Sequence, residues 1–185
     1  MDKFILEKEF TEGLKLIKMN PFKDERGEYV KSYSDRELAL LGINTKFLED
    51  NYLVSKKGSI RGLHYQIKNP EAKLIRCLKG KIMDVTVDLR KDSPTYKKVF
   101  KIILKEGDNR ILMVPKSFAH GFISLTDSVV FYKSSNYYFP GDQYGVSFFS
   151  NEINLDKILK QEGIKDKIIT EKDRNLLKLE DQNFF

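Results

Sequence analysis

Two histidines are the side chains best suited to proton transfer in this chain, because an imidazole has an unperturbed pKa of ~6.5. His64 lies in Arg-Gly-Leu-His-Tyr-Gln (residues 61–66), and His120 lies in Phe-Ala-His-Gly-Phe (residues 118–122). A hydrogen-bonded histidine in the core is the alternative interpretation of each. Arg61 next to a glycine favours a functional site, because a guanidinium is buried only where an anion or a carboxylate meets it.

A series of tyrosines and small polar residues offers a second kind of acid. In an extended strand, Tyr132, Ser134, Asn136 and Tyr138 lie on one face, because side chains alternate with a period of two. A phenol has a pKa of ~10 and can protonate a carbanion, and its ring can stack on a nucleotide base. A plain packing role remains the alternative for each tyrosine.

The residues that could hold a metal ion are too few. The chain has no His-x-His pair and a single cysteine, Cys77, whereas a metal site in a β-barrel needs three or four histidine or carboxylate ligands. We therefore expect no metal. One cysteine also cannot form an internal disulfide, which fits a reducing, cytoplasmic setting.

Residues 170–173, Thr-Glu-Lys-Asp, are typical of a helix N-terminus. Thr170 is suited to cap the helix and Asp173 to occupy its third position. On these grounds alone Asp173 has no functional role.

Short strands separated by turns must position these side chains. The alternation of Met83, Val85, Val87 and Leu89 with polar residues predicts a half-buried antiparallel strand, apolar on one face and polar on the other. Helices are expected after the capping pattern that begins at Ser34, over 154–161 and after Thr170. Many strands in the middle and helices near the ends predict a β-sandwich or barrel. The predicted strands are 14–18, 51–55, 73–78, 82–89, 98–104, 110–115, 121–125 and 129–134.

Length and composition fit one domain over residues 1–185. A hydrophobic fraction of 41% fills a core and excludes general disorder. No apolar run approaches the ~20 residues of a membrane helix, and the first ten residues do not resemble a secretory signal. The net charge of +6 suits an anionic ligand, but the basic residues are scattered, which argues against nucleic acid.

An ordered set of motifs resembles the dTDP-4-dehydrorhamnose 3,5-epimerase family over about residues 10–175. The motifs are Arg-Gly-Leu-His-Tyr-Gln (61–66), Ala-Lys-Leu-Ile-Arg (72–76), Asp-Val-Thr-Val-Asp-Leu-Arg (84–90) and Phe-Ala-His-Gly-Phe (118–122). The resemblance implies a mainly β, cupin-like jelly roll (double-stranded β-helix) with short N- and C-terminal helices. It also implies a homodimer without metal or cofactor that inverts C3 and C5 of a nucleotide-diphospho-4-keto-6-deoxyhexose through enolates.

The resemblance also implies roles for individual residues. His64 is the base, Asp173 its partner carboxylate, Tyr132 the acid on the opposite face, and Lys73 the cation near the enolate oxygen. The resemblance places further residues near the substrate: Arg26, Arg61 and Lys172, of which the arginines suit the diphosphate; His120 at the sugar; Tyr138 and a partner subunit's copy of Tyr29 at the base; and Asn51 as a polar contact.

Three positions depart from the family pattern. Lys31 and Gln143 stand where the family has glutamate, and Glu49 stands where it has glutamine. Glu49 and Gln143 are nevertheless expected at the substrate. Because the departures fall where base and sugar are recognised, a C3-only epimerase or keto-isomerase stays an alternative. A non-catalytic protein that binds sugar nucleotides or nucleic acid is a more distant one.

Overall fold

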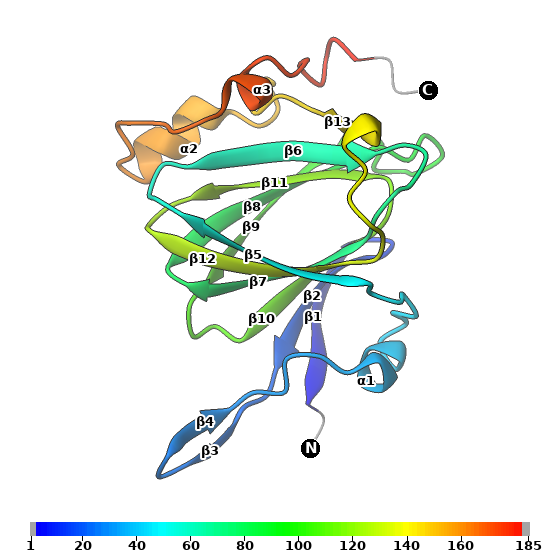
Figure 1. The fold of residues 1–185 in the computed structure, drawn as a ribbon, viewed down its shortest axis with the longest axis vertical. Helices are drawn as coiled ribbons and strands as arrows, with labels where there is room; N and C mark the ends of the chain where they lie inside the picture. The colour runs from blue at the N-terminus through cyan, green and yellow to red at the C-terminus, as the bar shows by residue number, and fades with distance from the viewer. Residues whose placement is uncertain (1–2, 183–185) are drawn as a thin grey trace.

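The computed structural model describes residues 3–182, and two antiparallel sheets face each other across its interior (Figure 1). The larger sheet has the order β1 (Phe4–Thr11), β2 (Leu14–Met19), β10 (Arg110–Val114), β7 (Lys73–Lys79), β12 (Ser128–Ser134), β5 (Glu49–Ser55). The smaller sheet has the order β13 (Gln143–Gly145), β6 (Ile60–Gln66), β11 (Phe118–Ser124), β8 (Lys81–Asp88), β9 (Val99–Lys105).

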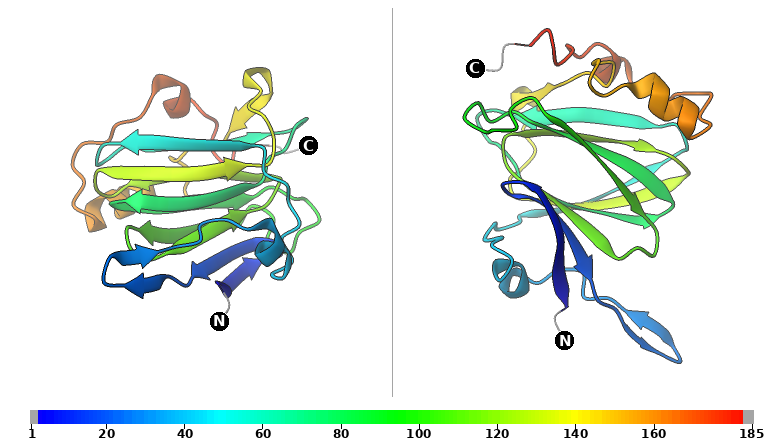
Figure 2. Two further views of the ribbon diagram at one scale, coloured as in Figure 1. Left: turned by 60° about the horizontal axis from the view of Figure 1, so that its bottom comes forward. Right: turned by 180° about the vertical axis from the view of Figure 1, so that it is seen from behind.

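Short helices lie on the outer side of each sheet. α2 (Leu155–Gln161) and α3 (Glu171–Arg174) lie over the smaller sheet, and α1 (Asp35–Ala39) lies beside the larger one (Figures 1 and 2). Ser34 caps α1 as expected, because its hydroxyl accepts a hydrogen bond from the Glu37 N–H at 3.3 Å. None of the helices among residues 3–182 is both long and apolar enough to cross a membrane.

Three apolar clusters hold these layers together. One fills the space between the sheets, with Ile75, Phe122 and Val130 among its members. A second packs α2 and the C-terminal segment onto the smaller sheet, and a third packs α1 onto the larger sheet. Polar side chains from both sheets line the same interior beside this cluster, His64 of β6 and Lys73 of β7 among them.

The expected mainly β jelly roll with short helices near both ends is confirmed, and every predicted strand and helix is present. The sequence pattern missed β1, β6, β13 and a hairpin of β3 (Phe22–Asp24) and β4 (Gly27–Tyr29). This hairpin projects away from both sheets (Figure 1). A short 3-10 turn, η1 (Pro140–Asp142), precedes β13.

One expectation about β8 is wrong. Its polar residues Asp84, Thr86 and Asp88 were expected on a solvated face, but all three are fully buried. The apolar side chains of β8 pack under α2, so the polar ones point into the sandwich. A polar face of a strand therefore lines the interior here.

Candidate active site

Strands β6 and β11 bring the two histidines together. In their register His120 lies directly opposite His64, so both side chains lie on the same face of the smaller sheet. The strands approach closely at Gly62, where φ is +92° and a Cβ would lie 2.7 Å from the His120 carbonyl oxygen. Glycine is therefore required at that position.

His64 is held by a carboxylate from the C-terminal region. Its Nε2 lies 2.7 Å from Asp173 Oδ1, and Asp173 Oδ2 accepts the Gly62 N–H at 3.0 Å. Because a carboxylate only accepts hydrogen bonds, Nε2 carries the proton and Nδ1 is left as the basic nitrogen. This pair gives His64 the orientation that a general base needs.

The cap expected at Thr170 is also present. Its hydroxyl accepts the backbone N–H of Asp173 at 3.2 Å, so α3 begins as the sequence indicates. The backbone of Asp173 belongs to the cap, whereas its side chain turns to His64. Burial raises the pKa of the Asp173 carboxyl, but the hydrogen bonds from His64 and Gly62 outweigh it and leave the pKa lowered.

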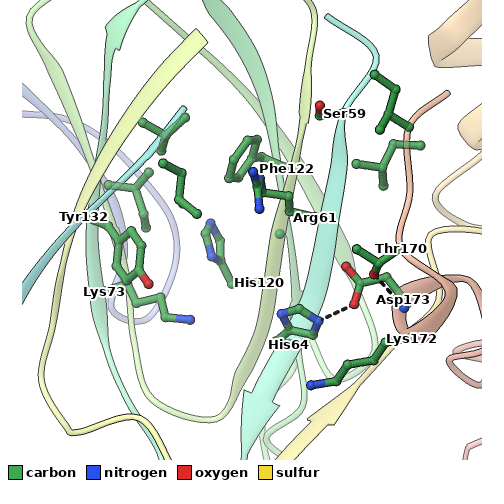
Figure 3. Close-up of a pocket in the computed structure, with 16 residues that line it drawn as sticks. Ser59, Arg61, His64, Lys73, His120, Phe122, Tyr132, Thr170, Lys172 and Asp173 are labelled. Carbon is green, nitrogen blue, oxygen red and sulfur yellow. Dashed lines mark hydrogen bonds and ion pairs between the residues drawn. The ribbon is translucent and has the colours of Figure 1, made fainter. Parts of the chain in front are cut away.

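The larger sheet supplies the opposite wall. Tyr132 on β12 and Lys73 on β7 project toward the histidines, and the Lys73 Nζ lies 5.7 Å from the centre of the Tyr132 ring (Figure 3). All four side chains line one cavity of about 370 Å³. Burial first, and then the charges of Glu71 and Glu49, raise the pKa of the Tyr132 phenol, so it is protonated at neutral pH.

His120 has its own carboxylate, which the sequence analysis did not identify. Its Nε2 lies 2.8 Å from Oδ2 of Asp84, a fully buried residue of β8. The regular alternation of β8 suggested a solvated face. Only the β8–β11 register indicates this role, because it places Asp84 opposite Phe122, two residues along β11 from His120 and on the same face.

Arg61 lies at the cavity wall but is exposed, so the expectation that it is buried against an anion is wrong. Its Nε donates to the Ser55 hydroxyl at 3.0 Å and its Nη2 to the Val54 carbonyl at 3.3 Å. Neither partner is charged, so these two contacts leave the positive charge of the guanidinium uncompensated.

A second cavity of about 270 Å³ adjoins the first and shares His64, Lys73 and Tyr132 with it. The other predicted substrate residues of this cavity are Glu49, Asn51, Tyr138 and Gln143. Lys172 lines the first cavity, and its ammonium donates to the side-chain oxygen of Gln143.

Two predicted residues lie outside both cavities. Arg26 is in the turn of the β3–β4 hairpin, where it pairs with Asp24, and Tyr29 ends the hairpin with 64% of its surface exposed. Lys31, a departure from the family pattern, pairs with Glu37 of α1 at 2.5 Å.

The arrangement suits proton transfer on both faces of one small molecule. It offers a carboxylate-bound imidazole on one sheet, a protonated phenol on the other, and an ammonium beside the phenol. Among residues 3–182, no three histidine, cysteine, aspartate or glutamate side chains gather closely enough to hold a metal ion.

Comparison with known proteins identifies the family. The profile of dTDP-4-dehydrorhamnose 3,5-epimerase matches residues 9–181. An enzyme of that name from Methanothermobacter thermautotrophicus is 36% identical over 176 residues, which are 95% of this chain and 94% of the relative. The enzyme from Shigella flexneri is 35% identical and covers 89% of this chain and 90% of its own.

Solved structures agree. The epimerase from Bacillus anthracis with TDP and PPi bound has a TM-score of 0.87 and 36% identity, covering 95% of this chain and 99% of its own. The enzyme from Legionella pneumophila in complex with dTDP-4-keto-L-rhamnose has a TM-score of 0.88 and 32% identity, covering 97% and 95%. This chain belongs to the dTDP-4-dehydrorhamnose 3,5-epimerase family.

Proposed function

We propose that this protein inverts C3 and C5 of a dTDP-linked 4-keto-6-deoxyhexose, dTDP-4-dehydro-6-deoxyglucose, in the synthesis of a deoxysugar. The observation that carries the proposal is that His64 and Tyr132 line one cavity from two facing sheets. The names of the relatives and the ligand of the Legionella pneumophila enzyme support the choice of sugar.

His64 removes the proton. A C–H bond next to a ketone is acidic because the resulting carbanion delocalises onto the ketone oxygen. With the Nε2 proton held by Asp173, the lone pair of Nδ1 is available to the substrate, and the imidazolium that forms is stabilised by the carboxylate.

Tyr132 returns a proton from the other face, which inverts the carbon. The phenol is protonated at neutral pH, as an acid must be. Lys73 and His120 line the same cavity and supply positive charge or hydrogen bonds where the enolate oxygen develops its charge. The same set acts at C3 and then at C5, because both carbons adjoin the C4 ketone.

The nucleotide occupies the second cavity and the cavity mouth. Arg61 and Lys172 donate to neutral protein groups, so their positive charges are available to bind a diphosphate. Tyr138 offers a ring for the base, and Glu49, Asn51 and Gln143 offer polar contacts. The Bacillus anthracis relative, which holds TDP, supports a thymidine nucleotide.

The alternatives are not favoured. The family profile and the curated relatives bear the name of a 3,5-epimerase, which disfavours a C3-only epimerase or a keto-isomerase. Two carboxylate-bound histidines at one cavity suit catalysis better than nucleic-acid binding. The single thiol, buried Cys77, is compatible with the cytoplasmic location that we propose.

We further propose that the protein is a homodimer whose hairpins complete each other's sites. The β3–β4 hairpin projects away from both sheets (Figure 1), and it carries Arg26 and Tyr29, which line neither cavity. Tyr52 and Val54 on β5 are 72% and 68% exposed, which leaves apolar surface for a second copy.

Deuterium incorporation tests the reaction. Incubation with dTDP-4-dehydro-6-deoxyglucose in deuterated water should place deuterium at both C3 and C5, as read by NMR. His64→Ala should abolish exchange at both carbons, whereas His120→Asn should slow it. Exchange at C3 alone would favour the C3-only alternative, and no exchange by the wild type would remove the proposal.

Complementation tests the dimer. A His64→Ala subunit keeps an intact hairpin, and a subunit with Arg26→Ala and Tyr29→Ala keeps an intact base. If hairpins cross between subunits, refolding an equal mixture of the two should restore about a quarter of wild-type activity, because half the dimers are mixed and each has one intact site. A mixture no more active than its parts would contradict the crossing.

A further inference from the structure

Glu71 bridges the two strands that carry Lys73 and Tyr132. Its Oε1 lies 2.8 Å from the Lys73 Nζ, and its Oε2 accepts the Ser134 hydroxyl at 2.5 Å. The side chains of Glu71 and Lys73 are only 15% and 13% exposed. A carboxylate this sheltered, with both oxygens engaged, holds its partners in a defined geometry.

The strand register brings this bridge beside the phenol. Lys73 lies directly opposite Ser134 in the β7–β12 pair, and Tyr132 precedes Ser134 by two residues and shares its face. Glu71, Lys73, Tyr132 and Ser134 all line the second cavity. The carboxylate therefore lies within the site, on the side of the proposed acid.

Two physical consequences follow from this position. The ammonium of Lys73, tethered to one carboxylate oxygen, cannot swing freely and points its remaining N–H groups toward the cavity. The negative charge of Glu71 also disfavours a second negative charge on the nearby phenol, and after burial it is the largest cause that raises the pKa of Tyr132.

Other groups act on the same phenol from the surrounding elements. Glu49 from β5 and Tyr138 from the loop after β12 raise its pKa, and Arg61 from β6 lowers it. His64, His120 and Lys172 line the first cavity with it. Glu71 differs from these because it also holds Lys73.

We propose that Glu71 is a positioning residue that fixes the Lys73 ammonium beside Tyr132 and places its own negative charge next to the phenol. The catalytic part of this inference rests on the proposed function. It assigns a role to a residue that neither the motifs nor the strand periodicity indicated.

Glu71→Gln removes the charge and preserves the shape. The amide oxygen can accept from Lys73 and the amide nitrogen can donate to the Ser134 hydroxyl, whose own proton can go to the Asn136 carbonyl 2.8 Å away. The matched control is Glu162→Gln, which breaks a similar ion pair with Lys81 at 2.9 Å outside both cavities.

The first readout needs no substrate. Proteins labelled with carbon-13 at the tyrosine Cζ are titrated by NMR, and Tyr132→Phe identifies the signal of Tyr132. We expect the midpoint of this signal to move to lower pH in Glu71→Gln and to stay unchanged in Glu162→Gln. Glu71→Asp, which keeps the charge, should restore the midpoint toward wild type. An unchanged midpoint in Glu71→Gln overturns the inference even if the proposed function holds.

The second readout tests the action through Lys73. Glu71→Gln should change the rate of deuterium exchange by about twofold or more, and this change should be smaller in a Lys73→Met background, where only the direct effect of the Glu71 charge on Tyr132 is left, because coupled residues are not additive. Equal effects in both backgrounds would remove Lys73 from the argument. Failure of the wild type to exchange deuterium would instead count against the proposed function.

Discussion

Asp173→Asn is the most informative single substitution, because the structure limits how an amide can fit. The carboxylate accepts two hydrogen bonds, one from His64 Nε2 at 2.7 Å and one from the Gly62 N–H at 3.0 Å. Asparagine has only one oxygen. If that oxygen faces His64, the amide nitrogen meets the Gly62 N–H and a buried donor loses its partner, at a cost of about 1–3 kcal/mol.

The amide is therefore expected to turn its oxygen to Gly62 and its nitrogen to His64. Nε2 must then accept a hydrogen bond, and the ring proton moves to Nδ1, the nitrogen that should take the substrate proton. Loss of a hydrogen bond to a charged group is worth about 1.5–3 kcal/mol, which corresponds to a rate loss of about 10- to 150-fold. The tautomer change adds to this loss.

The assay is deuterium exchange at C3 and C5 with kcat from the same samples, alongside thermal unfolding. Both carbons should slow together, because one base serves both. The cap of α3 uses the backbone N–H of Asp173 and the Thr170 hydroxyl, so it survives the substitution. Unchanged exchange rates with a lower unfolding temperature would refute the catalytic argument and leave Asp173 a purely structural role.

Three further substitutions test other parts of the site. Tyr132→Phe should slow reprotonation far more than proton removal, with Tyr144→Phe as the control. Because the pKa of Tyr132 is raised, the alkaline loss of wild-type activity should begin only above the ordinary phenol value of ~10. A Tyr132→Phe variant as active as the wild type would rule out Tyr132 as the acid. Gln143→Glu should pair a carboxylate with Lys172 and raise KM by about two- to fivefold with little change in kcat, and added salt should reduce this effect. An unchanged KM would mean that the Lys172 ammonium does not meet the diphosphate. Gly62→Ala should lower the free energy of unfolding by about 1–3 kcal/mol in denaturant titrations, because φ is positive there and the His120 carbonyl is close. Gly141→Ala, where a Cβ would meet open space, should not lower it. Equal stabilities of the two variants would contradict the close approach of the strands.

The strands that the sequence predicted are those with a buried, regularly alternating face. β1 was missed because most of its residues are exposed, as suits a strand at the edge of a sheet. β6 was missed because Gly62 interrupts its alternation, although this strand carries His64. A regular strand pattern therefore did not mark the strand that carries the base.

The sequence by itself determined the residue types for the chemistry, most of the strands and, through ordered motifs, the family. It could not show that Asp84 is buried against His120, that Glu71 bridges Lys73 and Ser134, or that Arg61 is exposed. His64 and Asp173 are 109 residues apart, and they meet only because α3 packs against β6. The local sequence pattern reports side-chain periodicity and helix capping, which involve residues close together in the chain. Contacts between the two sheets depend on strand order and register, which only the folded chain decides.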